Sequence, residues 1–250
     1  MRLDAVFFDL YGTLLIYGDM TTAWSAWLTA LQRWLEDLGL VMSPQELGRR
    51  CEGFFSRPEP TLVSDGVTLY ERRLQELAFE LGLEAGPTQV QQAAAATIGA
   101  WQQFVHLDPQ AGPVLSQLSQ RRSLALISNF DHPPHVQQVL EETGLARYFQ
   151  TVVISGEIGI KKPDPEIFAP AITAIGVSPE RVAYVGDAPE DILAAQAAGM
   201  TPIRLQRDGD TESDKAADFR HAVVPRKWTE GIEHFTVSTL GDLLPLIDKA

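Results

Sequence analysis

Short apolar runs alternate along much of the chain with longer segments whose apolar residues recur at helical spacing. The first run, within residues 3–9, is too short for a helix and is typical of a strand covered on both faces. Similar runs predict strands at residues 124–128, 151–154, 181–185 and 202–205. The segments between them predict helices at residues 109–120, 133–143, 164–175 and 189–198, and glycines favour helix ends at Gly144, Gly176 and Gly199. This alternation predicts an α/β fold with a doubly wound parallel sheet.

A stretch of about a hundred residues without strand-like apolar runs separates the first predicted strand from the second. Apolar residues, three tryptophans among them, recur at helical spacing over residues 24–38, and the pattern returns at residues 70–81 and 93–104. Ser43 and Glu46 are typical of a helix start, with the serine as cap and the glutamate reaching back to the backbone. We interpret the tryptophans as packing between helices, with the wall of a substrate pocket as the alternative.

These patterns predict two domains. We expect an α/β core domain of residues 1–15 and 106–250, with a helical domain of residues 16–105 inserted into it. The periodicity weakens after residue 205. There we expect a solvated loop of mixed charge without chemistry at 207–215, a short strand or ordered loop at 221–227, a strand edge at 237–240 and a closing helix at 241–247.

Charge and composition limit the partners that this chain can bind. The formal net charge is -13, whereas nucleic-acid binding needs a basic surface, so no nucleic-acid partner is expected. A small phosphorylated substrate is not excluded, because one metal ion and one lysine can reverse the field inside a pocket. No apolar run reaches the ~20 residues that cross a bilayer, so no membrane partner is expected. The single Cys51 and the lack of a secretory leader favour a cytoplasmic location, and the oligomeric state stays open.

Polar residues follow several of the predicted strands. In an open parallel sheet, ligands bind at the carboxyl ends of the strands, so these residues are expected to share one site. Taken singly, each has a plainer explanation as a turn former or a helix cap. The set comprises Asp9 and Thr13, then Ser128 and Asn129, then Lys161 and Lys162, and finally Asp187 and Asp191.

Taken in order, the segments around these residues resemble the four motifs of the haloacid dehalogenase-like hydrolases, a superfamily dominated by phosphatases. The resemblance covers nearly the whole chain, and the position of the helical insertion is similar to that in the helical-cap branch. It implies a Rossmann-like core with an inserted helical cap. The segments are Phe7-Phe8-Asp9-Leu10-Tyr11-Gly12-Thr13-Leu14, Ile127-Ser128-Asn129-Phe130-Asp131, Gly159-Ile160-Lys161-Lys162-Pro163-Asp164-Pro165-Glu166-Ile167-Phe168 and Tyr184-Val185-Gly186-Asp187-Ala188-Pro189-Glu190-Asp191.

The resemblance also implies a reaction and a cofactor. Asp9 would attack phosphorus and form an aspartyl-phosphate, which water then cleaves, so that one displacement becomes two easier steps. Mg²⁺ prefers a shell of oxygen ligands, and three are implied here: Asp9, the backbone carbonyl of Tyr11 and Asp187. The implied enzyme is therefore a Mg²⁺-dependent phosphatase that acts on a small phosphomonoester.

Further residues would bind the phosphate group. The resemblance implies Thr13, Ser128, Asn129 and Lys162, of which the lysine offsets charge in the transition state. Lys162 is chosen over Lys161 because the family lysine directly precedes the proline, and Lys161 is expected to be solvated. Asp191 would support the site by holding Lys162 or a metal-bound water, and as an acid near a helix N-terminus it would also be favoured by the helix dipole.

Tyr11 departs from the phosphatase pattern. Family phosphatases usually carry an aspartate here, which protonates the leaving group and activates water, and such assistance is typically worth ~10² to 10⁴-fold. Asp-Leu-Tyr-Gly-Thr is instead similar to L-2-haloacid dehalogenases, which need no metal and no leaving-group proton. The acidic fourth motif disfavours that alternative, since a buried acidic pair without a cation is costly. A catalytically weak binding protein is the other alternative.

Asp131, His132 and His135 are candidates to replace the missing acid. The plainer interpretation is that Asp131 caps the helix that begins at residue 133, and that both histidines lie on its exposed first turn. We therefore assign them no role in the reaction.

Overall fold

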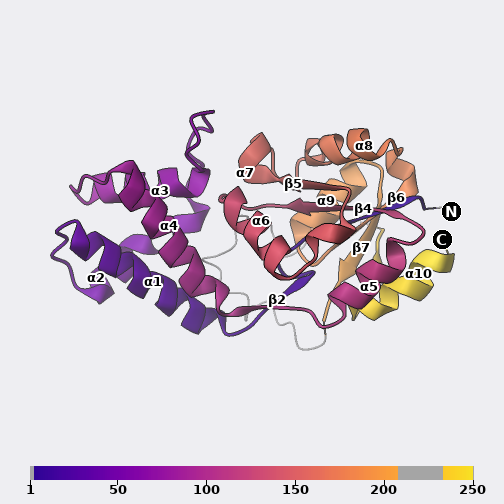
Figure 1. Cartoon of the computed structure of the whole chain (residues 1–250), viewed down its shortest axis with the longest axis horizontal. Helices are drawn as coiled ribbons and strands as arrows, with labels where there is room; N and C mark the ends of the chain where they lie inside the picture. The colour runs from indigo at the N-terminus through magenta and orange to yellow at the C-terminus, as the bar shows by residue number, and fades with distance from the viewer. Residues whose placement is uncertain (1–2, 208–232, 250) are drawn as a thin grey trace. The chain divides into compact units, whose positions relative to one another are not determined.

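The structure, a computed structural model, describes residues 3–207 and 233–249 (Figure 1). Its main feature is a six-stranded sheet with the order β5-β4-β1-β6-β7-β8, in which all neighbours are parallel. The strands are β1 (Ala5–Phe8), β4 (Ser123–Ser128), β5 (Thr151–Ile154), β6 (Val182–Gly186), β7 (Thr201–Leu205) and β8 (Phe235–Val237). The predicted doubly wound parallel sheet is confirmed. The predictions for 208–215 and 221–227 lie outside the described residues.

Helices cover both faces of this sheet (Figure 1). They are α5 (Ala111–Leu118), α6 (Pro133–Glu142), α7 (Ser155–Ile158), α8 (Ala169–Ile175), α9 (Pro189–Ala197) and α10 (Leu243–Lys249). The predicted helix at 164–175 was wrong in its first half, which is a 3₁₀ turn at Pro165–Phe168. Pro170 lacks the N–H that an α-helix would need there, so regular α-helix begins only at Ala169. The predicted glycine ends are confirmed, since Gly144, Gly176 and Gly199 have φ of 68°, 72° and 76°.

The bounds of several helices and strands differ from the predicted bounds by a few residues. The last strand is β8 (Phe235–Val237) rather than 237–240, where a 3₁₀ turn at Leu240–Asp242 precedes α10. Helix α5 begins at Ala111, two residues later than predicted, and the single-turn helix α7 was not predicted. Elements this short carry too little hydrophobic periodicity to be located from one sequence.

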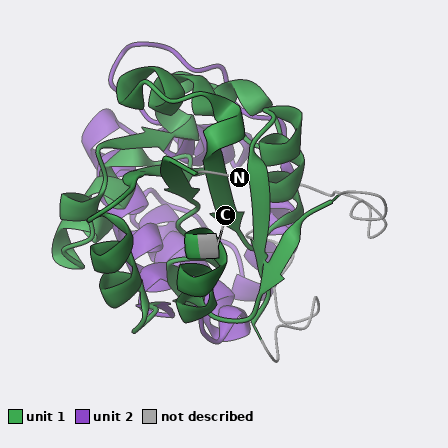
Figure 2. Ribbon diagram, turned by 90° about the vertical axis from the view of Figure 1, so that its right-hand side faces the viewer, with its two compact units in different colours: residues 1–16, 107–210, 224–250 green, residues 17–106, 211–223 purple. Residues whose placement is uncertain are grey.

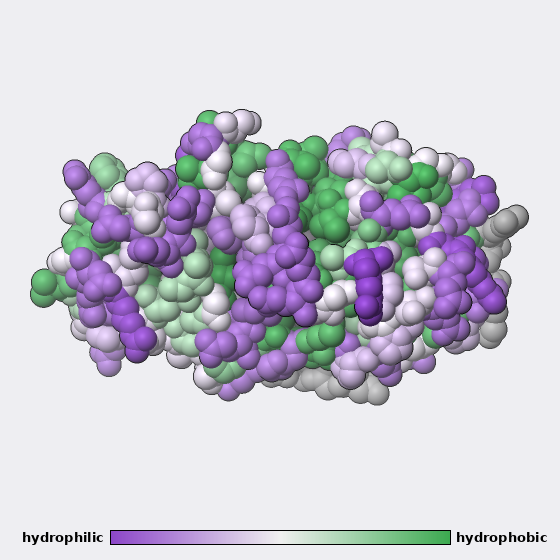
Figure 3. Space-filling model, in the orientation of Figure 1, coloured by the Kyte–Doolittle hydropathy of each residue, from purple (hydrophilic) through white to green (hydrophobic). Residues whose placement is uncertain are grey.

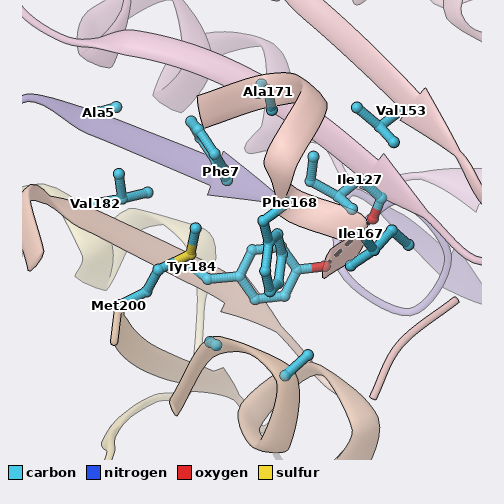
Figure 4. Packing of buried hydrophobic residues seen from close by; sticks show 13 residues of the cluster. Ala5, Phe7, Ile127, Val153, Ile167, Phe168, Ala171, Val182, Tyr184 and Met200 are labelled. Carbon is cyan, nitrogen blue, oxygen red and sulfur yellow. Dashed lines mark hydrogen bonds between the residues drawn. The ribbon is translucent and has the colours of Figure 1, made fainter. Parts of the chain in front are cut away.

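A cluster of buried side chains lies on one face of the sheet (Figure 4). Phe7 and Tyr184 extend from adjacent strands β1 and β6, and Phe168 packs on them from the 3₁₀ turn before α8. The rings of Phe168 and Tyr184 meet edge to face with centroids 4.9 Å apart, a favoured arrangement for aromatic pairs. This packing fixes the carboxyl ends of β1 and β6, from which the polar residues emerge.

The helical part consists of α1 (Met20–Asp37), α2 (Pro44–Cys51), α3 (Leu69–Glu80) and α4 (Pro87–Gln102). Trp27 is buried, as expected for packing between helices. The predicted cap of α2 is confirmed for Ser43, whose Oγ accepts from the Glu46 amide at 3.2 Å. The glutamate side chain does not reach back to the backbone but pairs with Arg49 and Arg50, which lie three and four residues on along the helix.

The described residues form two compact units (Figure 2): 3–16, 107–207 and 233–249 in one, and 17–106 in the other. The chain passes between them through two strands that pair with each other, β2 (Leu15–Tyr17) and β3 (Val105–Leu107). These strands were not predicted, because three residues are too few to produce a periodic pattern.

Hydrophilic residues surround small hydrophobic areas on the face of the molecule that Figure 3 shows. No helix among the described residues is both long enough and apolar enough to cross a membrane. Scattered apolar residues on a protein surface are ordinary and mark no binding site by themselves.

Candidate active site

Three carboxylates gather where neighbouring strands end. Asp9 follows β1, while Asp187 and Asp191 follow β6, and one oxygen of each lies within 4.8 Å of the others. All three residues are buried. Parallel pairing of β1 with β6 brings Phe8 beside Val185, so the residues that follow each strand leave the sheet together. The structure therefore brings together acids that are 178 and 182 positions, respectively, from Asp9 in the sequence.

Lys162 lies inside this cluster, with an exposed fraction of 3%. Its Nζ donates to Asp9 Oδ1 at 2.6 Å and to Asp191 Oδ1 at 2.7 Å. The Tyr184 hydroxyl at 2.9 Å and the Ile127 carbonyl at 3.2 Å are also within reach. The ammonium is thus oriented by oxygen atoms alone. Lys161, by contrast, is partly exposed.

Asn129 holds the backbone of this lysine. Its Nδ2 donates to the Lys162 carbonyl at 3.0 Å, and its Oδ1 accepts from the Lys162 amide at 2.9 Å. The amide side chain therefore links the end of β4 to the loop that carries the lysine. Substrate binding by Asn129 stays a prediction, and its side chain is already engaged by the protein.

Asp191 has both carboxylate oxygens in use. Oδ1 accepts from Lys162, and Oδ2 accepts from the Ala188 amide at 2.9 Å, at the start of α9. Asp191 therefore contacts Lys162, as expected for a residue that holds the lysine. It also contacts the N-terminus of α9, as expected for an acid favoured by the helix dipole. Both oxygens of Asp191 are therefore engaged by the protein, as is Oδ1 of Asp9.

The Ser128 hydroxyl is buried at the end of β4 and has no hydrogen-bond partner within the described part of the chain. Buried polar atoms without partners are rare in native proteins, and a ligand is one explanation for them. Thr13, also buried, contacts Asp187 Oδ1 through Oγ1 at a long 3.4 Å. Both hydroxyls can therefore serve an anionic ligand at little cost in existing hydrogen bonds.

Two glycines allow the backbone to approach the acids closely. Gly12 has φ of +90°, and a Cβ built there would lie 2.3 Å from Asp187 Oδ1. A Cβ on Gly186 would lie 2.4 Å from Asp191 Cγ. Any side chain at either position would displace a carboxylate, so glycine is required by both space and, at Gly12, backbone conformation.

Burial governs the electrostatics of the cluster. It raises the pKa of Asp9 well above its usual value, and Asp191 and Asp187 add to this while Lys162 opposes it. Burial raises the pKa of Asp191 as well, again against the attraction of Lys162. Burial disfavours the charged lysine, but Asp191, Asp9 and Tyr184 outweigh that effect and raise the pKa of Lys162. Three carboxylates face one ammonium here, and a divalent cation fits that donor set.

Tyr11 does not supply the missing acid through its phenol. Its side chain is buried and stacks on Phe130 with ring centroids 4.9 Å apart. Burial, and then the nearby Asp9 charge, raise the pKa of Tyr11 well above its ordinary value. The phenol therefore keeps its proton at neutral pH and forms an apolar wall beside Asp9.

The interpretation of the helix after Phe130 needs correction. The N-cap of α6 is His132 rather than Asp131, and its side chain makes no capping hydrogen bond. His135 is not exposed: it is half-buried against Phe130, with centroids 5.7 Å apart. Burial lowers the pKa of His135 to about 4. The sequence pattern missed this because it cannot show that an aromatic neighbour covers the first turn.

Two residues in contact with this region were missed by sequence reasoning. Tyr184 belongs to the hydrophobic cluster, yet its hydroxyl lies 3.2 Å from the Ile127 carbonyl (Figure 4). The same hydroxyl also lies 3.2 Å from Asp191 Oδ1. Arg207, which we expected in a solvated loop, donates to the backbone carbonyls of Gly12 and Thr13. Tyr184 lies within a quoted motif and could have been noticed there, whereas no local signal identifies Arg207.

Comparisons with known proteins agree with this geometry. The model of the haloacid dehalogenase-like hydrolases matches residues 3–199. A glyceraldehyde 3-phosphate phosphatase from Methanopyrus kandleri is 30% identical over 82% of this chain and 84% of its own length. A phosphoserine phosphatase from Thermus thermophilus is 36% identical over 59% of this chain, which spans 58% of that relative. The structure of a phosphatase from Thermococcus onnurineus superposes with a TM-score of 0.67 over 98% of both chains at 21% identity, which shows a common fold.

Proposed function

The chain belongs to the haloacid dehalogenase-like hydrolases, and on that basis we propose that it is a Mg²⁺-dependent phosphatase acting on a small phosphomonoester. One observation carries this proposal: Asp9, Asp187 and Asp191 form a buried cluster around Lys162. The two curated relatives act, by their names, on small phosphomonoesters, which supports a substrate of that class.

Asp9 performs the chemistry in this proposal. Its carboxylate attacks phosphorus as the bond to the ester oxygen breaks, and water then cleaves the aspartyl-phosphate to release inorganic phosphate. Lys162, 2.6 Å from Asp9, orients that carboxylate and offsets charge on the transferred group. Mg²⁺ bound by Asp9, the Tyr11 carbonyl and Asp187 would supply positive charge to the phosphate oxygens.

Hydroxyl groups hold the transferred group in place. Ser128 and Thr13 would donate to phosphate oxygens, and the buried, unpartnered Ser128 Oγ supports this role. The helical unit, residues 17–106, would act as the cap that selects the rest of the substrate. Specificity would then reside in that unit and the chemistry in the α/β unit.

Proton transfer is the weak step of the proposed reaction. The leaving alkoxide needs a proton, and Tyr11 with its raised pKa is a poor donor and a poor base. The enzyme is therefore expected to favour esters whose leaving groups are already stable as anions. Replacing Tyr11 with aspartate would restore the usual acid at this position.

The test measures hydrolysis of p-nitrophenyl phosphate and of an alkyl phosphate, each with Mg²⁺ and with a chelator. We expect metal-dependent hydrolysis of the activated ester by the wild type, none by Asp9→Asn, and faster hydrolysis of the alkyl ester by Tyr11→Asp. Activity that a chelator leaves undiminished would overturn the proposal. No gain in Tyr11→Asp would mean that another group transfers the proton.

Halide displacement from carbon is a second candidate, favoured by the apolar Tyr11–Phe130 pair beside the nucleophile. That reaction needs no leaving-group proton. It also needs no metal, however, and so does not explain why Asp187 is buried beside Asp9 at a cost in stability. Chloride release from L-2-chloropropionate without metal, in a protein inactive on phosphate esters, would support it. A protein that binds Mg²⁺ through Asp9 and Asp187 but turns over neither substrate would be a binding protein.

A further inference from the structure

Three successive carbonyl groups in the loop after the nucleophile are all engaged by two residues. Arg207 donates to the Gly12 carbonyl at 2.6 Å through Nη1 and to the Thr13 carbonyl at 2.7 Å through Nη2. The backbone N–H of Asp108 donates to the Leu14 carbonyl at 3.0 Å. Each carbonyl of residues 12–14 therefore accepts a hydrogen bond from one of these two residues.

The two residues that hold the loop also bind each other. Arg207 Nη2 lies 2.6 Å from Asp108 Oδ2, and the exposed fractions of the two side chains are 16% and 8%. Asp108 Oδ1 in turn accepts from the Gln110 amide at 2.8 Å, which fixes the carboxylate at the entry to α5. The planar guanidinium spans three acceptors at once, which the ammonium of a lysine does less well.

The loop held in this way carries the groups on which the proposed reaction depends. It follows Asp9 directly, it contains the Tyr11 carbonyl and Thr13, and it passes Asp187 at a glycine with φ of +90°. Its own turn is closed by the amides of Leu14 and Leu15, which both donate to the Leu10 carbonyl at 2.9 Å. A rotation of either peptide unit that Arg207 holds would move Thr13 relative to the acids.

We propose that Arg207 and Asp108 form a clamp that fixes loop 11–14 in its phosphate-binding conformation, which makes Arg207 a positioning residue. The proposal rests on the proposed phosphatase function for its kinetic consequence, but not for its structural one. Reacting groups must be placed closely, and a shift of about 1 Å can cost on the order of 10²-fold in rate. The clamp would fix the position of the loop through its backbone carbonyls, which Arg207 contacts, and not through the side chains of Asp9, Lys162 or Asp187.

The chain offers a matched control at the opposite ends of the strands. Arg181 Nη2 donates to Asp4 Oδ1 at 2.6 Å, and the Asp4 amide donates to the Arg181 carbonyl at 2.8 Å. This pair joins the same two residue types at the beginnings of β1 and β6, away from the acids, but it is more exposed, at 44% and 35% against 16% and 8% for Arg207 and Asp108. Arg181→Gln therefore reports what the loss of an arginine–aspartate pair does away from the site, where the cost to stability is small because exposed pairs are weak.

The experiment compares Arg207→Gln, Arg207→Lys and Arg181→Gln. For Arg207→Gln we expect kcat for p-nitrophenyl phosphate to fall by about 10²-fold, together with a higher KM and, for the same reason, weaker inhibition by inorganic phosphate. Arg207→Lys should recover part of the loss, and Arg181→Gln should match the wild type. Amide hydrogen exchange should become faster at residues 10–15 in Arg207→Gln, while the rest of the α/β unit exchanges as in the wild type.

Exchange is measured on the folded protein and needs no activity, so it separates the two proposals. If the wild type hydrolyses no phosphate ester but the loop exchanges faster in Arg207→Gln, the function is wrong and the clamp stands. If the wild type is active and Arg207→Gln equals Arg181→Gln in both kcat and exchange, the clamp is wrong. Uniformly faster exchange throughout the unit would also overturn it, because the arginine would then serve general stability.

Discussion

Each of the two units contains a buried polar network, and the two networks differ in a way that separates stability from function. In the helical unit, Trp27 Nε1 donates to the Tyr70 hydroxyl at 2.8 Å, which lies 2.6 Å from Thr97 Oγ1. Thr97 donates in turn to the Ala93 carbonyl at 2.7 Å. Every proton in this chain of neutral groups has an acceptor, so the network links α1, α3 and α4 and needs no ligand.

The network of the α/β unit is charged and incomplete. Asp9, Asp187 and Asp191 face one ammonium, that of Lys162, and the nearby Ser128 hydroxyl has no partner among the described residues. Excess buried negative charge costs stability unless a cation compensates it. The contrast teaches that a closed neutral network serves the fold, whereas an open charged one marks a site that a ligand completes.

Asp9→Asn tests this contrast with the largest expected effect. The amide keeps an acceptor for Lys162 but removes the nucleophile, so phosphatase activity should fall by at least ~10⁴-fold, as for other deleted nucleophiles. Thermal unfolding of the metal-free variant should occur at the wild-type temperature or higher, because one of the crowded charges is gone. Lost activity together with a clearly lower unfolding temperature would mean that the carboxylate stabilises the fold.

Mg²⁺ should stabilise the protein through the charged network. A ligand at 100 times its Kd adds about 2.7 kcal/mol to the free energy of unfolding, and calorimetry with increasing Mg²⁺ measures this. Asp187→Asn should abolish the shift, whereas Tyr70→Phe in the helical unit should leave it unchanged. An equal shift in Asp187→Asn would place the metal elsewhere.

The pH dependence of the metal-free protein should reveal the crowded acids. Burial raises the pKa of Asp9, and burial together with Asp191 raises the pKa of Glu190 to about 7. A carboxyl with a raised pKa binds its proton more tightly in the folded state, so the stability that these two groups contribute is greatest below about pH 4 and falls as the pH rises toward 7. His135, whose pKa burial lowers to about 4, has the opposite effect, since its contribution is lost as the pH falls below about 6.5. Each such group contributes a slope of at most about 1.4 kcal/mol per pH unit.

Saturating Mg²⁺ should flatten or reverse this dependence, because the metal favours the ionised carboxylates. Chemical denaturation at several pH values, with and without metal, measures both curves. Glu190→Gln removes one titrating group near the acids, so the free energy of unfolding of the metal-free wild type relative to this variant should fall between pH 4.5 and 7. A difference between the two proteins that stays constant or rises over that range would contradict the argument.

Buried strands explain why so much of the fold was predictable. A strand covered on both faces leaves a continuous apolar run, and the polar residue that ends such a run, as Asp9 does, must lie at the carboxyl edge of the sheet. The short linking strands β2 and β3 and the single turn α7 leave no such run, so they were missed.

Site residues could be predicted where local sequence carries their role. Asp9, Lys162 and Asp187 each lie in a motif, and the structure brings them to one place. Arg207 could not be recognised, because it binds backbone carbonyls 195 and 194 positions away, and carbonyl groups carry no sequence signal. Tyr184 was given no role although it lies in a motif, since its apolar ring and the hydroxyl that reaches Lys162 belong to one side chain.

Tyr70→Phe tests the contrast from the helical side with the smallest effect. It removes the hydroxyl that accepts from Trp27 and leaves that indole N–H buried without its partner, which should cost about 1–3 kcal/mol of unfolding free energy. Chemical denaturation measures this loss, and kcat for p-nitrophenyl phosphate should stay within a factor of two. Thr97 keeps the Ala93 carbonyl as acceptor, so the helical network opens at one end only. A loss of activity as large as that of Asp9→Asn would show that the neutral network also serves the reaction, and the distinction between the two networks would fail.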